Sequence, residues 1–293
     1  MKTILTGSSG LVGSALTPLL AHKGHEVVRL KRPTQWDPKT GTVDSSAFNQ
    51  AEVVVHLAGE SIASGRWNAA RKTRIRESRV EGTQLISETI SRMDRPPGVF
   101  VCASAIGYYG DRGNETLREE SVAGTGFLAD VCCEWEAATG AAVRKGIRVV
   151  NLRTGLVLSG KGGAMGKMLI PFRLGVGGKI GSGSQYWSWI SLEDLCNGIV
   201  HCIANSNLHG PVNMVSPSPV TNLQFTKALG RVLRRPTLFP VPAFAARLAL
   251  GEMADALLLA SARVEPTKLL SSGFAFKHRE LEPTLRALLI NAD

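Results

Sequence analysis

The feature that most constrains the fold is a glycine-rich turn between a strand-like segment and a helix-like segment, with the sequence Thr6-Gly7-Ser8-Ser9-Gly10-Leu11-Val12-Gly13. Its spacing, G-x-x-G-x-x-G, is a variant of the dinucleotide-binding fingerprint. Gly7 permits a tight turn, Gly10 lets the backbone approach a pyrophosphate, and Gly13 allows close packing of helix on sheet. Leu11 and Val12 open the helix, whose free N–H groups and positive dipole end favour a phosphate. The motif therefore predicts dinucleotide binding, with a purely structural turn as the alternative.

The segments around this turn alternate in type. Strand-like runs rich in Val, Ile or Leu occupy residues 2–6, 26–30, 52–56, 99–102 and 148–152, and helix-like segments occupy 11–23, 68–91 and about 125–144. Such alternation is typical of a parallel sheet covered by helices on both faces. We therefore predict an α/β fold in which residues 1–158 form a Rossmann-type, doubly wound parallel sheet.

The pattern changes after residue 155. Glycine-rich residues 159–184 predict a long functional loop rather than a regular layer. Helices are expected at 191–204, 223–233, 243–262 and 281–289, and three prolines in 211–221 favour extended or turning backbone. We predict that residues 159–293 form a substrate-side loop and a small C-terminal domain, with the helix near 191–204 packing back on the core.

The end of the second strand indicates which dinucleotide is preferred. Enzymes that use NAD usually place Asp or Glu there to accept hydrogen bonds from the ribose hydroxyls. Here the strand ends with Lys31 and Arg32, and no carboxylate follows until Asp37. A 2′-phosphate suits these cations, because each charge-assisted hydrogen bond contributes roughly 1.5–3 kcal/mol. We predict NADP (NADPH) as the cofactor, read mainly by Arg32; a solvated cationic strand end is the alternative.

The net charge narrows the possible partners. The 293 residues include 34 Lys and Arg against 24 Asp and Glu, a formal charge of +10. This excess suits an anionic small ligand, nucleic acid or anionic lipid. Without a basic tail, a zinc-finger spacing or an aromatic-basic RNA-binding motif, nucleic acid is the weaker interpretation. No charge-free run is long enough to span a bilayer, so we expect no membrane partner.

The cysteines and the first residues indicate the compartment. Five cysteines, an odd number without a C-x-x-C pair, predict reduced buried thiols rather than a disulfide framework or a metal site. Met1-Lys2 leads directly into a strand-like run, without the pattern of a signal peptide. We therefore expect a cytoplasmic protein.

Further segments carry a resemblance to a known family. They are Val54-Val55-His56-Leu57-Ala58-Gly59 and residues 104–111, 135–136, 170–175 and 210–213. With the glycine turn, they resemble the extended short-chain dehydrogenases/reductases, and in particular the atypical, NAD-dependent epimerase/dehydratase-like family of SDR39U1/YfcH type. The resemblance covers essentially the whole chain, and residues 236–289 look like that family's small C-terminal domain. It implies that Leu57, Ala58 and Gly59 lie beside the cofactor's adenosine diphosphate.

The same resemblance implies a Tyr-x-x-x-Lys pair, in which lysine lowers the pKa of a tyrosine that shuttles a proton. This chain has no such pair, because the residues four places after its three tyrosines are Arg112, Gly113 and Ile190. Alignment on Trp135-Glu136 puts Leu128 and Cys132 at the expected positions.

The remaining catalytic candidates are Ser104, Tyr108 or Tyr109, and Cys132. Ser104 lies one place from the position of the family's substrate-binding serine, which Ala105 occupies. Tyr109 is more simply explained by packing beside the cofactor, and Cys132 by burial in a helix. Glu134 and Glu136 are expected to be surface carboxylates of that helix.

Cations cluster in and before the helix predicted at 68–91, at Arg66, Arg71, Lys72, Arg74, Arg76 and Arg79. The family's N-x-x-G-T motif has Arg79 in place of its asparagine. The resemblance puts Arg74 and Arg79 beside the cofactor, where they would join its anion site, and we assign Lys161 of the glycine-rich region to the same set. A solvated charged face is the alternative.

These observations predict an NADP(H)-binding oxidoreductase or epimerase-like enzyme with an atypical active site. Its substrate would be an anionic hydroxyl or carbonyl compound or a nucleotide sugar, and the protein would be a monomer or homodimer. The alternative is a non-catalytic protein that senses NADPH and regulates or interacts with a partner. The missing Tyr-x-x-x-Lys pair favours this alternative, and hydride transfer is the observation that separates the two.

Overall fold

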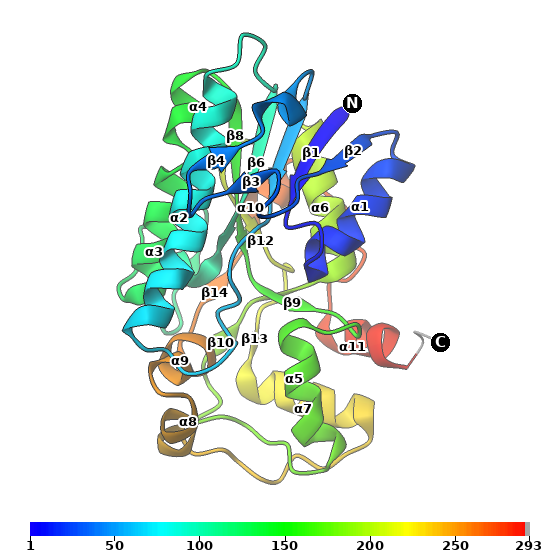
Figure 1. Cartoon of the computed structure of the whole chain (residues 1–293). Coiled ribbons are helices and arrows are strands. Elements are labelled where there is room, and N and C mark those ends of the chain that lie inside the picture. Colours follow the sequence, from blue (N-terminus) through cyan, green and yellow to red (C-terminus); the bar gives the residue numbers. More distant parts are fainter. Residues whose placement is uncertain (291–293) are drawn as a thin grey trace.

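A six-stranded parallel sheet forms the centre of the computed structural model, which describes residues 1–290 (Figure 1). In spatial order its strands are β12 (Gly210–Met214), β8 (Arg148–Thr154), β6 (Val99–Ala105), β5 (Val53–His56), β1 (Lys2–Thr6) and β2 (Glu26–Arg29). All neighbouring strands are parallel. The predicted Rossmann-type sheet is therefore confirmed, and its sixth strand comes from beyond residue 158.

The strand order reverses beside β1. From β1 the chain passes outward to β2 and later returns to β5 on the other side of β1. Thr6 and His56 end these two strands in register. Ligands of open α/β sheets bind at the carboxyl ends of the strands where the order reverses. The candidate site is therefore expected at the ends of β1 and β5.

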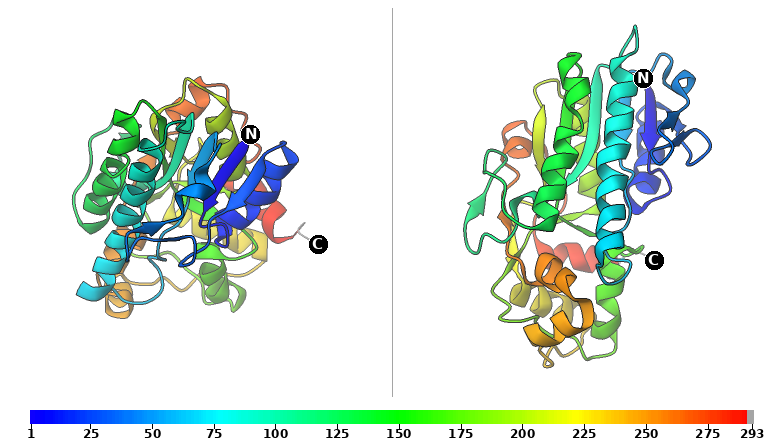
Figure 2. Two further views of the ribbon diagram at one scale, coloured as in Figure 1. Left: turned by 45° about the horizontal axis from the view of Figure 1, so that its top comes forward. Right: turned by 60° about the vertical axis from the view of Figure 1, so that its left-hand side comes forward.

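Helices cover both faces of the sheet (Figure 2). On one face α1 (Leu11–His22) packs against α6 (Leu192–Ala204), and on the other α2 (Ala69–Ser91) packs against α3 (Phe127–Ala137) and α4 (Gly140–Arg144). The helix predicted near 191–204 thus forms and packs on the core. The helix predicted over 125–144 breaks in two, because the Thr139 hydroxyl donates to the Glu136 carbonyl and competes with the continuing helix.

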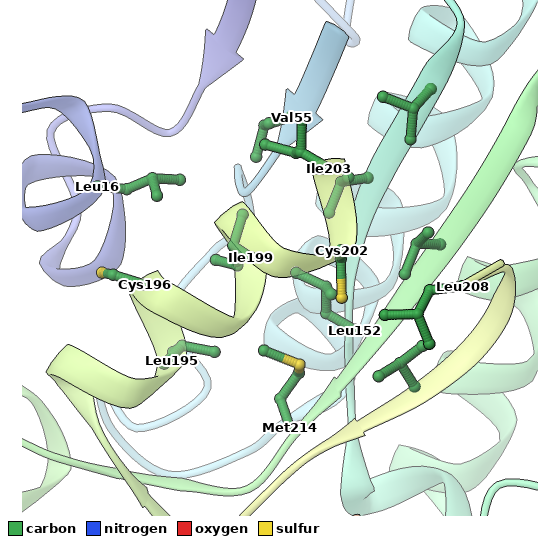
Figure 3. Close-up of a cluster of buried hydrophobic side chains, with 14 of the residues drawn as sticks. Leu16, Val55, Leu152, Leu195, Cys196, Ile199, Cys202, Ile203, Leu208 and Met214 are labelled. Atoms are coloured by element: carbon green, nitrogen blue, oxygen red, sulfur yellow. The ribbon is translucent and has the colours of Figure 1, made fainter. Parts of the chain in front are cut away.

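Alternate strand residues supply the two cores. Val53 and Val55 face α1 and α6, whereas Val54 faces α2. In Figure 3, side chains of α1 and α6 meet those of β5, β8 and β12 in the first of these cores. Each fully buried aliphatic side chain contributes roughly 1.5–3 kcal/mol to folding. Four of the five cysteines are buried, as the sequence predicted.

A second group of elements follows β8. β9 (Leu156–Leu158) is parallel to β11 (Trp189–Ser191), and β10 (Tyr186–Trp187) is antiparallel to β13 (Val220–Thr221). α5 (Gly163–Arg173), α7 (Asn222–Leu233) and α11 (Leu281–Leu289) enclose a third core. The remaining elements are α8 (Ala243–Leu250), α9 (Glu252–Ala254), the π-helical turn η3 (Asp255–Leu259), α10 (Thr267–Ser271) and β14 (Arg263–Val264), which pairs with β7 (Thr116–Leu117).

Two expectations for this part were wrong. Residues 159–184 contain the helix α5, which buries Met165, Leu169 and Phe172 on one face; the many glycines around them obscured this helical spacing. The helix expected over 243–262 breaks at Gly251, whose φ of +63° ends α8. Within residues 1–290, no helix combines the length and apolarity needed to cross a membrane.

Candidate functional site

The turn between β1 and α1 has the geometry of a phosphate-binding loop. Gly7 has a φ of +70°, and a Cβ on it would lie 2.7 Å from the Leu57 carbonyl carbon. A Cβ on Gly13 would collide with the Gly7 carbonyl oxygen and lie 2.7 Å from the Ser8 Cα. A Cβ on Gly10 would meet only the Gly7 oxygen, at 3.4 Å. Gly7 and Gly13 are thus required by the turn itself, and Gly10 leaves room for a ligand at the backbone.

The N-terminus of α1 is open to an anion. Gly10 is its N-cap and supplies no side-chain cap, and no acidic residue lies in the first turn. The N–H groups of Leu11, Val12 and Gly13 belong to this turn, where intrahelical acceptors are missing. The segment that begins α5 lies close to the N-terminus of α1, because a Cβ on Gly163 would lie 2.8 Å from the Leu11 side chain. The exposed Lys161 stands two residues earlier in that segment.

Arg32, in the segment after β2, packs against a buried aromatic side chain. The Arg32 guanidinium carbon lies 5.4 Å from the ring centroid of Trp36, which is buried in the hairpin of β3 (Trp36–Asp37) and β4 (Thr42–Val43). Its Nη2 is 3.5 Å from the Asp37 carboxylate, and 39% of the side chain is exposed. Lys31 is exposed beside it. This loose ion pair leaves guanidinium donors available to a phosphate.

The end of β5 lies against the glycine turn. His56 is fully buried and shares a 2.7 Å hydrogen bond between its Nδ1 and the Thr6 hydroxyl. Burial lowers the pKa of His56 to about 4, so its ring is neutral at pH 7. The backbone of Leu57 and Ala58 borders Gly7. The Leu57–Gly59 segment is therefore in the predicted place beside the turn.

Arg79 is a largely buried cation next to this segment. A Cβ on Gly59 would lie 3.6 Å from the Arg79 Cζ. The guanidinium donates to the carbonyls of Ile75 and Glu60, each at 3.0 Å, and stacks 5.0 Å from the Trp135 ring centroid. Burial lowers the pKa of Arg79. No carboxylate of residues 1–290 forms an ion pair with Arg79, and an uncompensated cation of this kind favours an anionic ligand.

The other cations near the start of α2 have partners. Glu60 accepts from Arg71 at 2.8 Å and from Arg74 at 3.5 Å. Lys72 pairs with Glu252, Arg76 with Glu134, and Arg66 donates to the Leu248 carbonyl. Arg74 is half exposed and shares its carboxylate, so of the two arginines assigned to the anion site, Arg79 has the stronger structural support.

A buried ion pair lies at the carboxyl ends of β6 and β8. The Arg153 guanidinium, with 3% of its side chain exposed, donates to both Glu136 oxygens at 2.8 and 2.9 Å. The Ser104 hydroxyl donates to the same carboxylate at 2.7 Å. Burial alone would lower the pKa of Arg153, but Glu136 and Tyr109 raise it above its usual value. Glu136 is thus not the surface carboxylate that its place in the sequence suggested, whereas Glu134 is exposed beside Arg76.

The two adjacent tyrosines differ in setting. Tyr109 is buried, donates to the Asn213 side chain at 2.6 Å and accepts from Arg153 at 3.0 Å; burial raises its pKa to about 12. Tyr108 is half-buried, and the Arg153 Cζ lies 3.4 Å from its ring centroid. Within residues 1–290 the Tyr108 hydroxyl forms no hydrogen bond. Tyr108 is therefore the freer phenol.

The positions expected for the Tyr-x-x-x-Lys pair pack against η2 (Ile106–Tyr109). A Cβ on Gly107 would lie 3.3 Å from the Leu128 Cβ and 3.7 Å from the Cys132 sulfur. Burial raises the pKa of the Cys132 thiol to about 12. Cys132 is thus a packed, protonated thiol, because burial outweighs the opposing effect of the nearby Arg79 on its pKa.

The sequence analysis missed Arg153 and its network. Arg153 also donates to the Glu119 carbonyl, and Glu119 in turn accepts from the Asn213 and Lys268 N–H groups. One Glu119 oxygen is buried without a partner, and burial raises the pKa of this carboxyl. The signal in the sequence was an arginine that directly continues the apolar strand 148–152, a position where a charge needs a buried partner.

Comparison with known proteins agrees with this architecture. Residues 3–214 match the NAD dependent epimerase/dehydratase family, and residues 241–288 match a domain of unknown function, DUF1731. An epimerase family protein of Mycobacterium bovis is 43% identical over 288 residues, which cover 96% of this chain and 95% of that protein.

Two solved structures are similar over nearly the whole chain. The human epimerase family protein SDR39U1, crystallised with NADPH, has a TM-score of 0.89 and 33% identity and covers 99% of this chain and 100% of its own. A nucleoside-diphosphate sugar epimerase from Corynebacterium glutamicum has a TM-score of 0.81 and 37% identity, with 99% of this chain and 58% of that chain covered.

Proposed function

This chain belongs to the NAD dependent epimerase/dehydratase family, and from that premise we propose that it binds NADPH and acts as an oxidoreductase or epimerase on an anionic substrate. The observation that carries the proposal is the pairing of the uncapped α1 N-terminus at Gly10 with the reachable guanidinium of Arg32. The first suits a pyrophosphate and the second a 2′-phosphate. The NADPH in the human relative's crystal structure supports the same cofactor.

The residues present fit a dinucleotide. A Cβ at Gly7 or Gly13 would destroy the turn, so the chain holds this loop in a shape that presents backbone N–H groups. Leu57 and Ala58 supply the apolar wall beside it, and Arg32 stands where a carboxylate would repel a phosphate. When bound, the nicotinamide supplies hydride chemistry; the protein has to orient substrate and move protons.

The protein's own acid-base group is proposed to be Tyr108. Its phenol is free of hydrogen bonds within residues 1–290 and stacks on the Arg153 guanidinium. Arg153 thus places a cation from strand β8 against the face of the Tyr108 ring. Ser104 is held by Glu136, so we assign it to positioning that carboxylate rather than to the substrate.

An anionic substrate is supported by the cations at the same edge. Arg79 lies beside Gly59 without a carboxylate partner, and Lys161 is exposed in the segment that approaches Leu11. The formal charge of +10 raises the local concentration of anions. We further propose a cytoplasmic location, because buried free thiols suit a reducing compartment.

A second function, NADPH sensing without catalysis, is favoured by one observation. Leu128 and Cys132 occupy the positions of the usual acid and its lysine, and the Cys132 thiol has a pKa of about 12. A protein that kept the cofactor loop and lost these groups would bind NADPH and report its presence through the C-terminal helices.

A titration of tryptophan fluorescence with NADPH and with NADH tests the binding. We expect NADPH to bind at least tenfold more tightly, and Arg32→Ala to remove about tenfold of this preference. One charge-assisted contact contributes roughly 1.5 kcal/mol at a partly exposed site. The control is Arg29→Ala, an exposed arginine within β2 itself. Failure to bind either nucleotide would refute the proposal.

Hydride transfer separates the two functions. Deuterium-labelled NADPH is incubated with carbonyl compounds, which accept a hydride, and NADP⁺ is incubated with hydroxyl compounds and nucleotide sugars, which donate one. Transfer is followed as label in the product, as formation of NADPH or as formation of the epimer. Transfer that Tyr108→Phe abolishes, while NADPH affinity is unchanged, supports the enzyme. Tight binding without transfer to any member supports the sensor, and transfer at an unchanged rate in Tyr108→Phe would refute the assigned acid.

A further inference from the structure

A basic hollow lies at the C-terminal end of α7. Figure 1 shows α7 in the lower part of the molecule with α5 and α8, away from the six-stranded sheet. The hollow has a volume of about 430 Å³ and is lined by Lys227, Gly230, Arg231, Arg234, Arg235, Pro236 and Thr237. Four of these seven residues are cations. None of the residues assigned above to the cofactor or to catalysis lines it.

The backbone holds these cations together. Arg234 caps α7 with φ +53° and ψ +44°, a left-handed conformation that a non-glycine residue rarely adopts. The chain therefore folds back, and the Arg235 N–H donates to the Gly230 carbonyl at 2.9 Å. A Cβ on Gly230 would collide with the Thr237 side chain and lie 3.0 Å from the Arg235 oxygen. The wall formed by residues 235–237 is thus pinned to the helix.

The charges of the hollow are poorly compensated. Arg231 pairs with Glu282 at 2.6 Å, but Glu282 also pairs with Arg286. Lys227, Arg234 and Arg235 form no ion pair with any carboxylate of residues 1–290. A helix C-terminus attracts cations, which accounts for one or two of them. All four are exposed, so solvent screens part of their mutual repulsion, and an anion held between them would remove the rest.

We propose that this hollow binds an anion bearing phosphate groups with at least two negative charges. Arginine offers planar, paired donors that match phosphate oxygens, and three arginines surround the hollow. The phosphate could belong to a soluble compound or to a lipid headgroup, since Leu238 and Phe239, with 77% and 57% exposure, follow the hollow directly. The chemistry recognised is the same in both cases.

The test is a calorimetric titration of the full-length protein with inorganic pyrophosphate in the presence of saturating NADPH. Bound NADPH occupies the Gly10 and Arg32 region, so that pyrophosphate cannot bind there. If NADPH does not bind, the titration is repeated with Arg32→Ala, which removes the arginine of that region. We expect one pyrophosphate per chain, and a loss of at least tenfold in affinity in Arg234→Ala/Arg235→Ala. The matched control is Arg144→Ala/Lys145→Ala, which removes two adjacent exposed cations from the end of another helix, α4.

A second arm identifies the source of the phosphate. Sedimentation is measured with vesicles of phosphatidylcholine alone and with added phosphatidylglycerol. Binding to the anionic vesicles that Leu238→Ser/Phe239→Ser abolishes indicates a headgroup, and pyrophosphate binding without vesicle binding indicates a soluble compound. The proposal is overturned if neither probe binds, or if both double arginine and control variants weaken binding equally, since that result would show only general charge attraction.

Discussion

Replacing Arg153 by methionine should cost the protein a large part of its stability. The substitution keeps an unbranched side chain but removes both hydrogen bonds to Glu136, the bond to the Tyr109 hydroxyl and the bond to the Glu119 carbonyl. It leaves the Glu136 carboxylate, 13% exposed, with the Ser104 hydroxyl as its remaining side-chain partner. Breaking one side of a buried pair typically costs 3–5 kcal/mol.

We therefore expect about 4 kcal/mol less free energy of unfolding, which corresponds to a melting temperature roughly 8–16 °C lower. Urea unfolding followed by tryptophan fluorescence measures the change, with the slope m compared to confirm that both proteins unfold alike. The control is Arg118→Met, which breaks an exposed pair with Glu265 and should cost no more than about 1 kcal/mol.

The double variant Arg153→Met/Glu136→Leu separates the charge effect from lost packing. Replacing both members by apolar groups removes the stranded carboxylate, so the double variant should be more stable than Arg153→Met alone by about 2 kcal/mol. A cost below about 1 kcal/mol for Arg153→Met, or a double variant as unstable as the sum of the singles, would show that the pair is not the stabilising unit inferred from its geometry.

Two further predictions concern the cofactor end. Gly13→Ala should abolish NADPH binding while the fold persists, because its Cβ would displace the Gly7 carbonyl. The control Gly166→Ala, whose Cβ meets open space within α5, should leave binding intact. NADPH titration measures the binding, and circular dichroism shows whether the fold persists. Because the folded pKa of His56, about 4, lies below its ordinary 6.5, the unfolded state binds more protons between these values. The contribution of His56 to the free energy of unfolding is complete above pH 6.5 and falls by about 3 kcal/mol as the pH drops to 4. Urea unfolding at several pH values should therefore show a smaller loss of stability in His56→Gln than in the unchanged protein. An equal loss in both proteins would contradict the assignment.

The geometry of the glycine turn could be predicted from sequence because local residues determine it. Gly7 and Gly13 are required by the backbone of one turn, and Arg32 follows the neighbouring strand directly. Such local geometry needs no knowledge of distant contacts. The helix α5 was not predicted, because its segment is rich in glycine and has an apolar face of only three residues, Met165, Leu169 and Phe172. The burial of this face depends on packing against α7 and α11.

The Arg153 network could not be predicted because its groups meet across long sequence separations. Glu136, Arg153 and Asn213 come from a helix and two strands, and their pairing follows from sheet register, since Arg153 lies opposite Asn213. From the sequence alone, Glu136 is expected on the helix surface, because its partner Arg153 on strand β8 is known only from the three-dimensional structure. Long-range pairing of this kind is what a single sequence reveals least.

The glycine turn and the Arg153 network place different demands on side chains. The proposed phosphate contacts require backbone N–H groups and an arginine, which residues 7–13 and 32 could supply. Transferring a proton requires a titratable group beside a charge, and the charge of Arg153 is shared between the Tyr108 ring and the Glu136 carboxylate. Glu136 thus neutralises much of the charge that faces the Tyr108 ring. Hydride transfer that depends on Tyr108 therefore distinguishes the proposed enzyme from the proposed sensor.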